Sequence, residues 1–118
     1  MAFKKSQAVT EFLWPVTVDV PVNGKHQPHL FTGRFRIPVD DEAKQVLDEI
    51  LSGQVDEIAL CRRVWIGWQE GHVQDEDGSP LPETPDNIEF FTELPYFRRG
   101  LMRAYVESQA GKKAAAKN

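Results

Sequence analysis

Residues 11–22 alternate between apolar and polar side chains, the pattern of a strand with one buried face. The even positions from Phe12 to Val22 are all apolar, whereas the odd positions include Thr17 and two prolines, Pro15 and Pro21. Because proline cannot donate a ladder hydrogen bond, these two residues place the strand at the edge of a sheet or divide it in two.

The dipeptide Asn23-Gly24 directly after this segment predicts a two-residue hairpin turn, since a type I′ turn needs two positive φ angles. The return strand is expected at residues 30–39, and residues 26–29 could form a longer tip. Such a turn pairs residues whose numbers add to 47, so Val16 faces Phe31 and the two apolar faces coincide. A one-residue slip would separate them, so the register is specified.

Two amphipathic helices are predicted after the hairpin, because apolar residues recur there every three or four positions. The first follows a possible cap at Asp40-Asp41 and stops at Gly53. The second begins near Asp56 and continues to Trp68. The apolar faces consist of Ala43, Val46, Leu47, Ile50 and Leu51 in the first helix, and Ile58, Cys61, Val64, Trp65 and Trp68 in the second.

Two more helices are predicted after residue 80. Thr84-Pro85 combines an N-cap with proline at the first helical position, and Pro95 ends this short helix. The last helix runs from Tyr96 to Gln109. The inward residues are Ile88, Phe91 and Leu94 in the third helix, and Phe97, Leu101, Ala104 and Tyr105 in the fourth.

These elements predict one α+β domain, an antiparallel hairpin followed by about four short helices, over residues 11–109. Residues 1–10 are expected to be a flexible N-terminus and residues 110–118 a disordered basic tail. The length of 118 residues, with 41% apolar and 27% charged side chains, suits a single globular domain. One cysteine fits a reducing cytosol, and the net charge of −4 argues against nucleic-acid binding. No apolar run is long enough to span a membrane.

The acidic segment Gly67–Asn87 resembles a calcium loop only superficially. With Gly78 at the sixth position of an EF-hand loop, Asp75 and Asp77 occupy ligand positions, but the first and last positions hold Val73 and Thr84. The segment is therefore interpreted as a connector with a tight Asp-Gly turn.

Other catalytic and metal-binding patterns are weak. His26, His29 and His72 lack the second cysteine that would complete a zinc site with Cys61, and Cys61 lies on an apolar helix face. No phosphate-binding glycine motif occurs. We therefore predict a protein that is not an enzyme, with no catalytic residue, no metal ligand and no cofactor.

A basic cluster is the remaining candidate site. Arg98, Arg99 and Arg103 are expected on the outer side of the last helix, either as a solvated face or as a docking surface for an acidic partner. The edge of the N-terminal hairpin is a second candidate, because unpaired strand edges can bind another chain.

Several segments, taken in order, resemble the tail assembly chaperones of long, flexible-tailed bacteriophages and their prophages. The matching segments are FTGRFRIPVDDE (31–42), VWIGWQEGHVQDEDGSPLPETPDNIEFF (64–91), RRGLMRAYVESQAG (98–111) and KKAAAKN (112–118). The resemblance covers residues 11–118. Its most specific part is a tryptophan-ended helix, an Asp-Gly turn and a Thr-Pro helix start in fixed order.

The resemblance implies a chaperone that keeps the tape-measure protein soluble and helps to recruit tail-tube subunits. Such proteins are thought to self-associate, act in the cytoplasm of the bacterial host and are absent from the mature virion. Many are also made as a longer product by −1 ribosomal frameshifting, and residues Ala110 to Lys113 could be encoded by codons that contain the slippery heptamer this step needs. The alternative is a small phage structural protein, such as a head–tail connector or a tail-completion subunit.

Overall fold

The computed structural model describes residues 2–54 and 56–115, and its N-terminal hairpin is the one that the sequence predicts. Strands β1 (Glu11–Val22) and β2 (Lys25–Arg36) pair antiparallel around Asn23-Gly24, whose φ angles of 43° and 86° are both positive. All twelve pairs follow the predicted register, from Glu11 opposite Arg36 to Val22 opposite Lys25. The return strand therefore begins at residue 25 instead of 30, without a longer tip, and ends three residues earlier than expected.

The prolines of the hairpin lie where they remove no bond between its strands. Residues that flank a two-residue turn form a hydrogen-bonded pair, so the odd residues of β1, including Pro15 and Pro21, direct their backbone nitrogens away from β2. Thr32, opposite Pro15, correspondingly directs its backbone away from β1. Its amide donates to His72 Nδ1 at 3.0 Å, and its carbonyl accepts from the Gln69 amide at 2.9 Å.

A third strand was not predicted. Helix α2 (Glu57–Val64) ends at Val64, and the next four residues form strand β3 (Trp65–Trp68), which pairs antiparallel with β2. The sheet order is β1-β2-β3, with β1 at one edge. The prediction of a helix continuing to Trp68 is wrong because pairing with β2 overrides a local spacing that also suits a helix.

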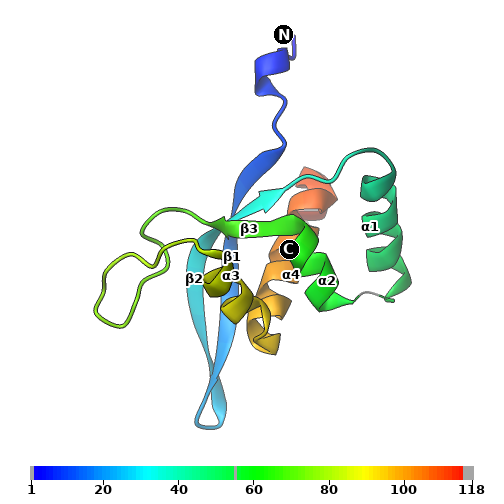
Figure 1. Cartoon of the computed structure of the whole chain (residues 1–118). Coiled ribbons are helices and arrows are strands. Elements are labelled where there is room, and N and C mark those ends of the chain that lie inside the picture. Colours follow the sequence, from blue (N-terminus) through cyan, green and yellow to red (C-terminus); the bar gives the residue numbers. More distant parts are fainter. Residues whose placement is uncertain (1, 55, 116–118) are drawn as a thin grey trace.

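Helices cover one face of this sheet (Figure 1). Helix α4 (Pro95–Ala115) packs extensively on β1, and α2 and α3 (Pro85–Thr92) pack against α4. At the closest approach, a Cβ on Gly100 would lie 2.6 Å from the Thr17 carbonyl oxygen. One core results, and its buried apolar residues are Val16, Val18, Phe31, Phe35, Val46, Leu60, Cys61, Val64, Trp65, Trp68, Phe97, Leu101, Met102, Ala104 and Tyr105.

Helix α1 (Asp40–Ser52) differs from the other three because it lies to one side of the core (Figure 1). Its C-terminus has the predicted left-handed Gly53, with φ of 73°. Its N-terminus does not have the predicted aspartate cap: Val39 occupies the cap position and no side chain caps the helix, while Asp40 has a positive φ of 57°.

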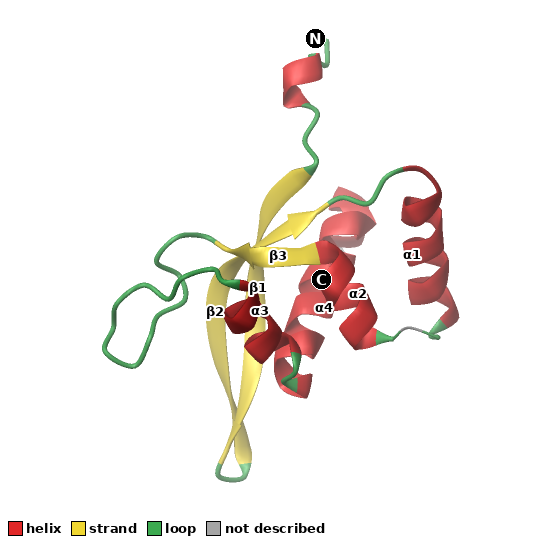
Figure 2. Cartoon of the chain, viewed as in Figure 1, coloured by secondary structure: helices red, strands yellow, loops and turns green. Residues whose placement is uncertain are grey.

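Helices α2 and α3 both start with a side-chain cap, and the cap at Thr84 is the one that the sequence predicts. The carboxylate of Asp56 accepts from the amides of Ile58 and Ala59 at 3.1 and 3.2 Å, and the Thr84 hydroxyl accepts from the Asn87 amide at 3.2 Å. Between β3 and α3, residues 69–84 form an irregular connector (Figure 2). Its Asp-Gly turn is closed by a 2.9 Å bond from the Gly78 amide to the Asp75 carbonyl.

Both ends of the chain differ in part from the expectation. A single 3-10 turn, η1 (Lys5–Gln7), forms within the N-terminal segment. Helix α4 continues to Ala115, beyond the predicted end at Gln109, so the proposed tail begins as helix; residues 116–118 lie outside the described residues.

Candidate partner-binding surfaces

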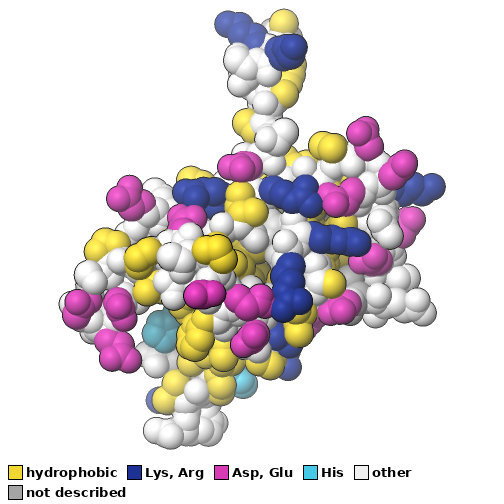
Figure 3. All heavy atoms as spheres, viewed as in Figure 1, with side chains coloured by type: hydrophobic (Ala, Val, Ile, Leu, Met, Phe, Trp, Pro, Cys, Tyr) yellow, Lys and Arg dark blue, Asp and Glu magenta, His cyan; other side chains and the backbone are white. Residues whose placement is uncertain are grey.

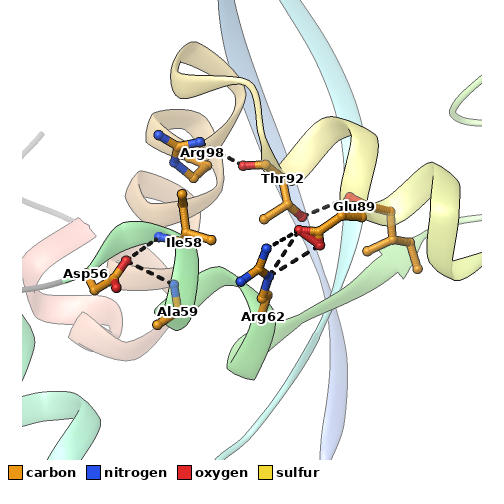
Figure 4. A network of polar contacts seen from close by, with 8 residues as sticks. Asp56, Ile58, Ala59, Arg62, Glu89, Thr92 and Arg98 are labelled. Carbon is orange, nitrogen blue, oxygen red and sulfur yellow. Dashed lines mark hydrogen bonds and ion pairs between the residues drawn. The ribbon is translucent and has the colours of Figure 1, made fainter.

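The three candidate arginines do not share one surface. The side chain of Arg98 is only 13% exposed and points toward the junction of α2 and α3 (Figure 4), so its prediction as an outward residue is wrong. Its Nη1 donates to the Thr92 carbonyl at 2.9 Å, and its Nε lies 3.9 Å from Glu57. Arg98 therefore joins the end of α3 to α2 and α4. Adjacent helical residues point about 100° apart, which separates Arg98 from Arg99.

Arg99 and Arg103 face a shallow groove between α4 and the hairpin. The groove has a volume of about 370 Å³, and its other walls include Asp19, His26 and Tyr96. Arg103 Nη1 lies 3.5 Å from the Asp19 carboxylate, with both side chains about half exposed, so this pair is weak. Arg99 forms no ion pair within the described residues. These two arginines, not three, remain available to an anionic group of a partner.

The edge of the hairpin is a poor site for an added strand. Pro15 and Pro21 remove two outward donors from β1, and Gly100 of α4 covers the outward carbonyl of Thr17. Proline and a covering helix are two devices by which proteins protect an exposed edge. We therefore find the second predicted surface blocked over part of its length.

An uncovered apolar surface lies on α1, where only Val46 is buried. Leu47 is 51% exposed and Leu51 is 76% exposed, although both belong to the predicted apolar face. Within the described chain, α1 has no extensive packing with any other helix or strand. Between α1 and α4 runs a groove of about 220 Å³, called the α1–α4 groove below, whose walls are Pro38, Ala43, Val46, Leu47, Ile50, Tyr105 and Gln109.

The charge of α1 is strongly negative. The helix contains five acidic residues and one lysine, Lys44. Two of the acids are paired with the domain, Glu42 with Arg36 at 2.7 Å and Glu49 with Arg63 at 3.6 Å. The other three, Asp40, Asp41 and Asp48, have no ion-pair partner among the described residues. Asp41 and Asp48 line a different hollow on α1, so the α1–α4 groove itself is lined by apolar side chains together with Tyr105 and Gln109.

Three residues that were considered for catalysis or metal binding, Cys61, His72 and Asp77, have local environments that suit a structural role. Cys61 is fully buried, and burial, followed by the nearby carboxylate of Glu57, raises the pKa of its thiol to about 12. His72 Nδ1 accepts a hydrogen bond from the Thr32 amide, which holds the connector against β2. The Ser79 hydroxyl and amide hold the pKa of Asp77 below its usual value. No group of three or more metal-binding side chains occurs in residues 2–54 and 56–115.

The remaining ion pairs connect neighbouring elements of the domain instead of forming a site. Arg62 on α2 binds both carboxylate oxygens of Glu89 on α3 (Figure 4), which raises the pKa of Arg62 and lowers that of Glu89. Arg34 Nη1 similarly contacts both oxygens of Glu83, at 3.1 and 2.9 Å, and ties the end of the connector to β2. Both pairs are exposed enough to be screened by solvent.

Sequence reasoning missed the α1–α4 groove, although a signal for it was present. The predicted apolar face of α1 is long and continuous, while the following helices and the hairpin already supply enough apolar residues for a core. Two neighbouring exposed leucines on such a helix mark a candidate binding surface.

Comparison with protein-family models, with curated proteins and with solved structures gave no match. None of the described helices combines the length and the hydrophobicity that crossing a bilayer requires.

Proposed function

We propose that the chain is a non-enzymatic tail assembly chaperone of a long, flexible-tailed bacteriophage or prophage. It binds the tape-measure protein, helps to recruit tail-tube subunits, acts in the cytoplasm of the bacterial host and is absent from the mature virion. The observation that carries the proposal is the uncovered apolar face of α1, because a chaperone of this kind needs an exposed apolar surface on a folded domain.

The α1–α4 groove suits a helical client. An amphipathic helix binds by laying its apolar face into a groove, with apolar residues at three-to-four-residue spacing as anchors. Leu47 and Leu51 are one turn apart on α1 and present such a surface. Fully burying one leucine side chain contributes about 1.5–3 kcal/mol, and Leu47 and Leu51 are already partly covered, so their burial by a client contributes less than twice this value and leaves the client releasable.

The groove beside the hairpin supplies a second contact of a different kind. The exposed guanidinium groups of Arg99 and Arg103 can bind carboxylates of the same client or of the tail-tube protein. The proposal therefore assigns the apolar anchor to α1 and a polar contact to α4.

Co-expression with the tape-measure protein of the same genome tests the proposal. We expect the intact chain to raise the soluble fraction of the tape-measure protein several-fold, and the double variant Leu47→Glu/Leu51→Glu to lose this effect. Leu30→Glu is the matched control, because Leu30 is 72% exposed on the hairpin, away from α1. A tape-measure protein that is equally insoluble with and without the chain would contradict the proposal. Stoichiometric amounts of the chain in purified virions would instead favour a structural subunit.

A further inference from the structure

The groove between α4 and the hairpin, called the α4–hairpin groove below, is lined mainly by polar and charged residues. The helix contributes Tyr96, Arg99, Gly100 and Arg103, which share one helical face, and the hairpin contributes Thr17, Asp19 and His26. The volume of about 370 Å³ would admit a small molecule, but small-molecule sites are lined mainly by apolar and aromatic side chains. The lining therefore suits a charged group that a larger partner presents.

The charges of the groove leave one positive charge unbalanced. Arg99 is exposed and forms no ion pair within the described residues. Arg103 lies 3.5 Å from the Asp19 carboxylate, farther than the roughly 2.7–2.9 Å of a strong charge-assisted hydrogen bond. With His26 counted as neutral, two guanidinium groups share the groove with one carboxylate. The excess matches one further carboxylate better than a phosphate group, which carries a charge of about −1.5 to −2 at pH 7.

The surface outside the groove disfavours larger anions. The chain has a net charge of −4, and acidic side chains are spread over much of the face seen in Figure 3. A nucleic acid extends beyond the groove and would approach these acids, whereas one acidic side chain stays next to the two arginines. Because salt screens charges beyond about 8 Å in physiological solution, the nearby arginines dominate the interaction with a single carboxylate. These observations favour an acidic peptide segment as the occupant.

Asp19 pairs with Arg103 only weakly. The side chain of Asp19 is 43% exposed and that of Arg103 is 55% exposed, so solvent screens their attraction. The backbone of Asp19 belongs to β1, which holds its carboxylate on one wall of the groove. A partner carboxylate is free of this restraint and can contact both guanidinium groups, whose planar forks favour directed hydrogen bonds. Asp19 would therefore compete with a partner for Arg103.

The α4–hairpin groove and the α1–α4 groove lie on opposite sides of α4. Arg103 lines the first groove and Tyr105 lines the second, and two residues turn a helix by about 200°. Ala104, which points between them, is buried in the core. A straight client helix in one groove cannot reach into the other, so the two grooves suit two separate segments.

We propose that the α4–hairpin groove binds an acidic side chain of a peptide segment other than the helix that occupies the α1–α4 groove. The carboxylate binds between Arg99 and Arg103 and displaces Asp19, so that both grooves can be filled at the same time. The carboxylate site depends on the α4–hairpin groove alone, whereas the assignment of a client helix to the α1–α4 groove rests on the proposed function.

Nuclear magnetic resonance titration of the full chain with an end-blocked tetraglutamate peptide tests the site. We expect the peptide to shift the side-chain signals of Arg99 and Arg103, and Arg99→Ala and Arg103→Ala each to raise its dissociation constant about three- to fivefold. Arg62→Ala is the matched control, because Arg62 is 57% exposed and lies outside the groove, and it should leave the dissociation constant unchanged. A dissociation constant that neither groove substitution changes overturns the site.

The kind of anion is tested by replacing the probe. A tetraglutamine peptide should not bind, and inorganic phosphate and a single-stranded oligonucleotide should bind more weakly than tetraglutamate. Phosphate or the oligonucleotide binding as tightly as the peptide, with the same loss in Arg99→Ala and Arg103→Ala, would overturn the assignment to a carboxylate.

The competing role of Asp19 predicts a gain of affinity. Asp19→Asn should lower the dissociation constant of tetraglutamate about three- to fivefold, because it removes both the competitor and one negative charge. Asp48→Asn removes the same charge from an exposed position on α1 and serves as the matched control, with little expected effect. Weaker binding in Asp19→Asn would show that Asp19 holds the arginines in place, and it would overturn the competition.

The separation of the two grooves is tested with both partners. Leu47→Ser/Leu51→Ser, which adds no charge, should leave tetraglutamate binding unchanged, and Arg99→Ala/Arg103→Ala should keep the full solubilisation of the tape-measure protein. A loss of solubilisation in the arginine variant as large as in Leu47→Glu/Leu51→Glu would show that one client uses both grooves, which overturns the separation. If the intact chain does not solubilise the tape-measure protein, the proposed function fails, whereas the peptide titration still supports or overturns the carboxylate site.

Discussion

Helices α1 and α4 both have apolar residues at three-to-four-residue spacing, but only α4 buries them within the chain. Five apolar residues of α4, namely Phe97, Leu101, Met102, Ala104 and Tyr105, lie in the core, whereas α1 contributes Val46 alone. Helix α4 also approaches β1 so closely that Gly100 contacts the Thr17 backbone. Helix α1 is connected to the domain by two ion pairs and a few apolar contacts.

The difference shows that amphipathicity specifies which side of a helix is apolar without specifying what covers it. For α4 the cover is the sheet, and the interaction is part of folding. For α1 the described residues supply no comparable cover, and we propose that a client helix supplies it. Elements with few buried contacts also open at lower free energy than the core. Substitutions on the apolar face of α4 are therefore expected to lower stability, whereas substitutions on the apolar face of α1 are expected to weaken binding.

The largest expected effect is a contrast between two identical substitutions. Leu101→Ala removes a fully buried side chain from α4 and should lower the free energy of unfolding by about 2–5 kcal/mol, through lost burial and a residual cavity. Leu51→Ala on α1, where the side chain is 76% exposed, should change it by less than about 0.5 kcal/mol. Chemical denaturation at a concentration where the chain is monomeric measures both. Similar losses for the two variants would contradict the contrast between the helices.

A second substitution tests how closely α4 packs on β1. Gly100→Ala places a methyl group 2.6 Å from the Thr17 carbonyl oxygen, which forces the helix and strand apart. The strain should cost about 1–3 kcal/mol, partly offset by the gain of about 1 kcal/mol in helix propensity. Arg99→Ala, at the neighbouring exposed position, is the control and should have little effect on thermal unfolding. A stabilised Gly100→Ala variant would show that the contact is looser than described.

The hairpin could be predicted residue by residue because its information is local. The Asn23-Gly24 turn and the alternation around it specify one register, and the structure has that register throughout. Strand β3 could not be predicted in the same way, since Trp65 and Trp68 are three residues apart and four residues are too few to show a strand period. Its pairing with β2 depends on residues thirty or more positions away.

The candidate surfaces show the same division between what local sequence indicates and what tertiary packing decides. The sequence indicated Arg99 and Arg103 correctly as exposed residues, but it could not show that Arg98 turns inward to the Thr92 carbonyl. Nor could it show that Leu47 and Leu51 stay uncovered, because burial depends on how the loop after β2 places α1 relative to α4. Both outcomes are properties of tertiary packing, which a single helical period does not contain.

The pH dependence of stability measures how well the core excludes water around α2. Burial raises the pKa of Cys61 from 9.0 to about 12, so the unfolded chain loses this proton at lower pH than the folded chain. This contribution is fully present below pH 9 and is lost as the pH rises toward 12. Between pH 9 and pH 10 the free energy of unfolding should fall by about 1 kcal/mol, because the unfolded thiol is already half deprotonated at pH 9, and Cys61→Ala should remove this slope. Burial also raises the pKa of Tyr105, from 10.0, so its contribution starts only above pH 10.

The smallest expected effect separates the two helix starts. The carboxylate of Asp56 accepts two amide hydrogen bonds at the start of α2, whereas the start of α1 has no side-chain cap. Asp56→Ala should therefore lower the free energy of unfolding by about 1 kcal/mol and speed amide hydrogen exchange in the first turn of α2. Asp48→Ala, in the exposed middle of α1, is the matched control and should stay within about 0.5 kcal/mol of the intact chain. An equal loss in both variants would mean that α1 is as strongly coupled to the core as α2 is, and the uncovered face of α1 would then need another explanation.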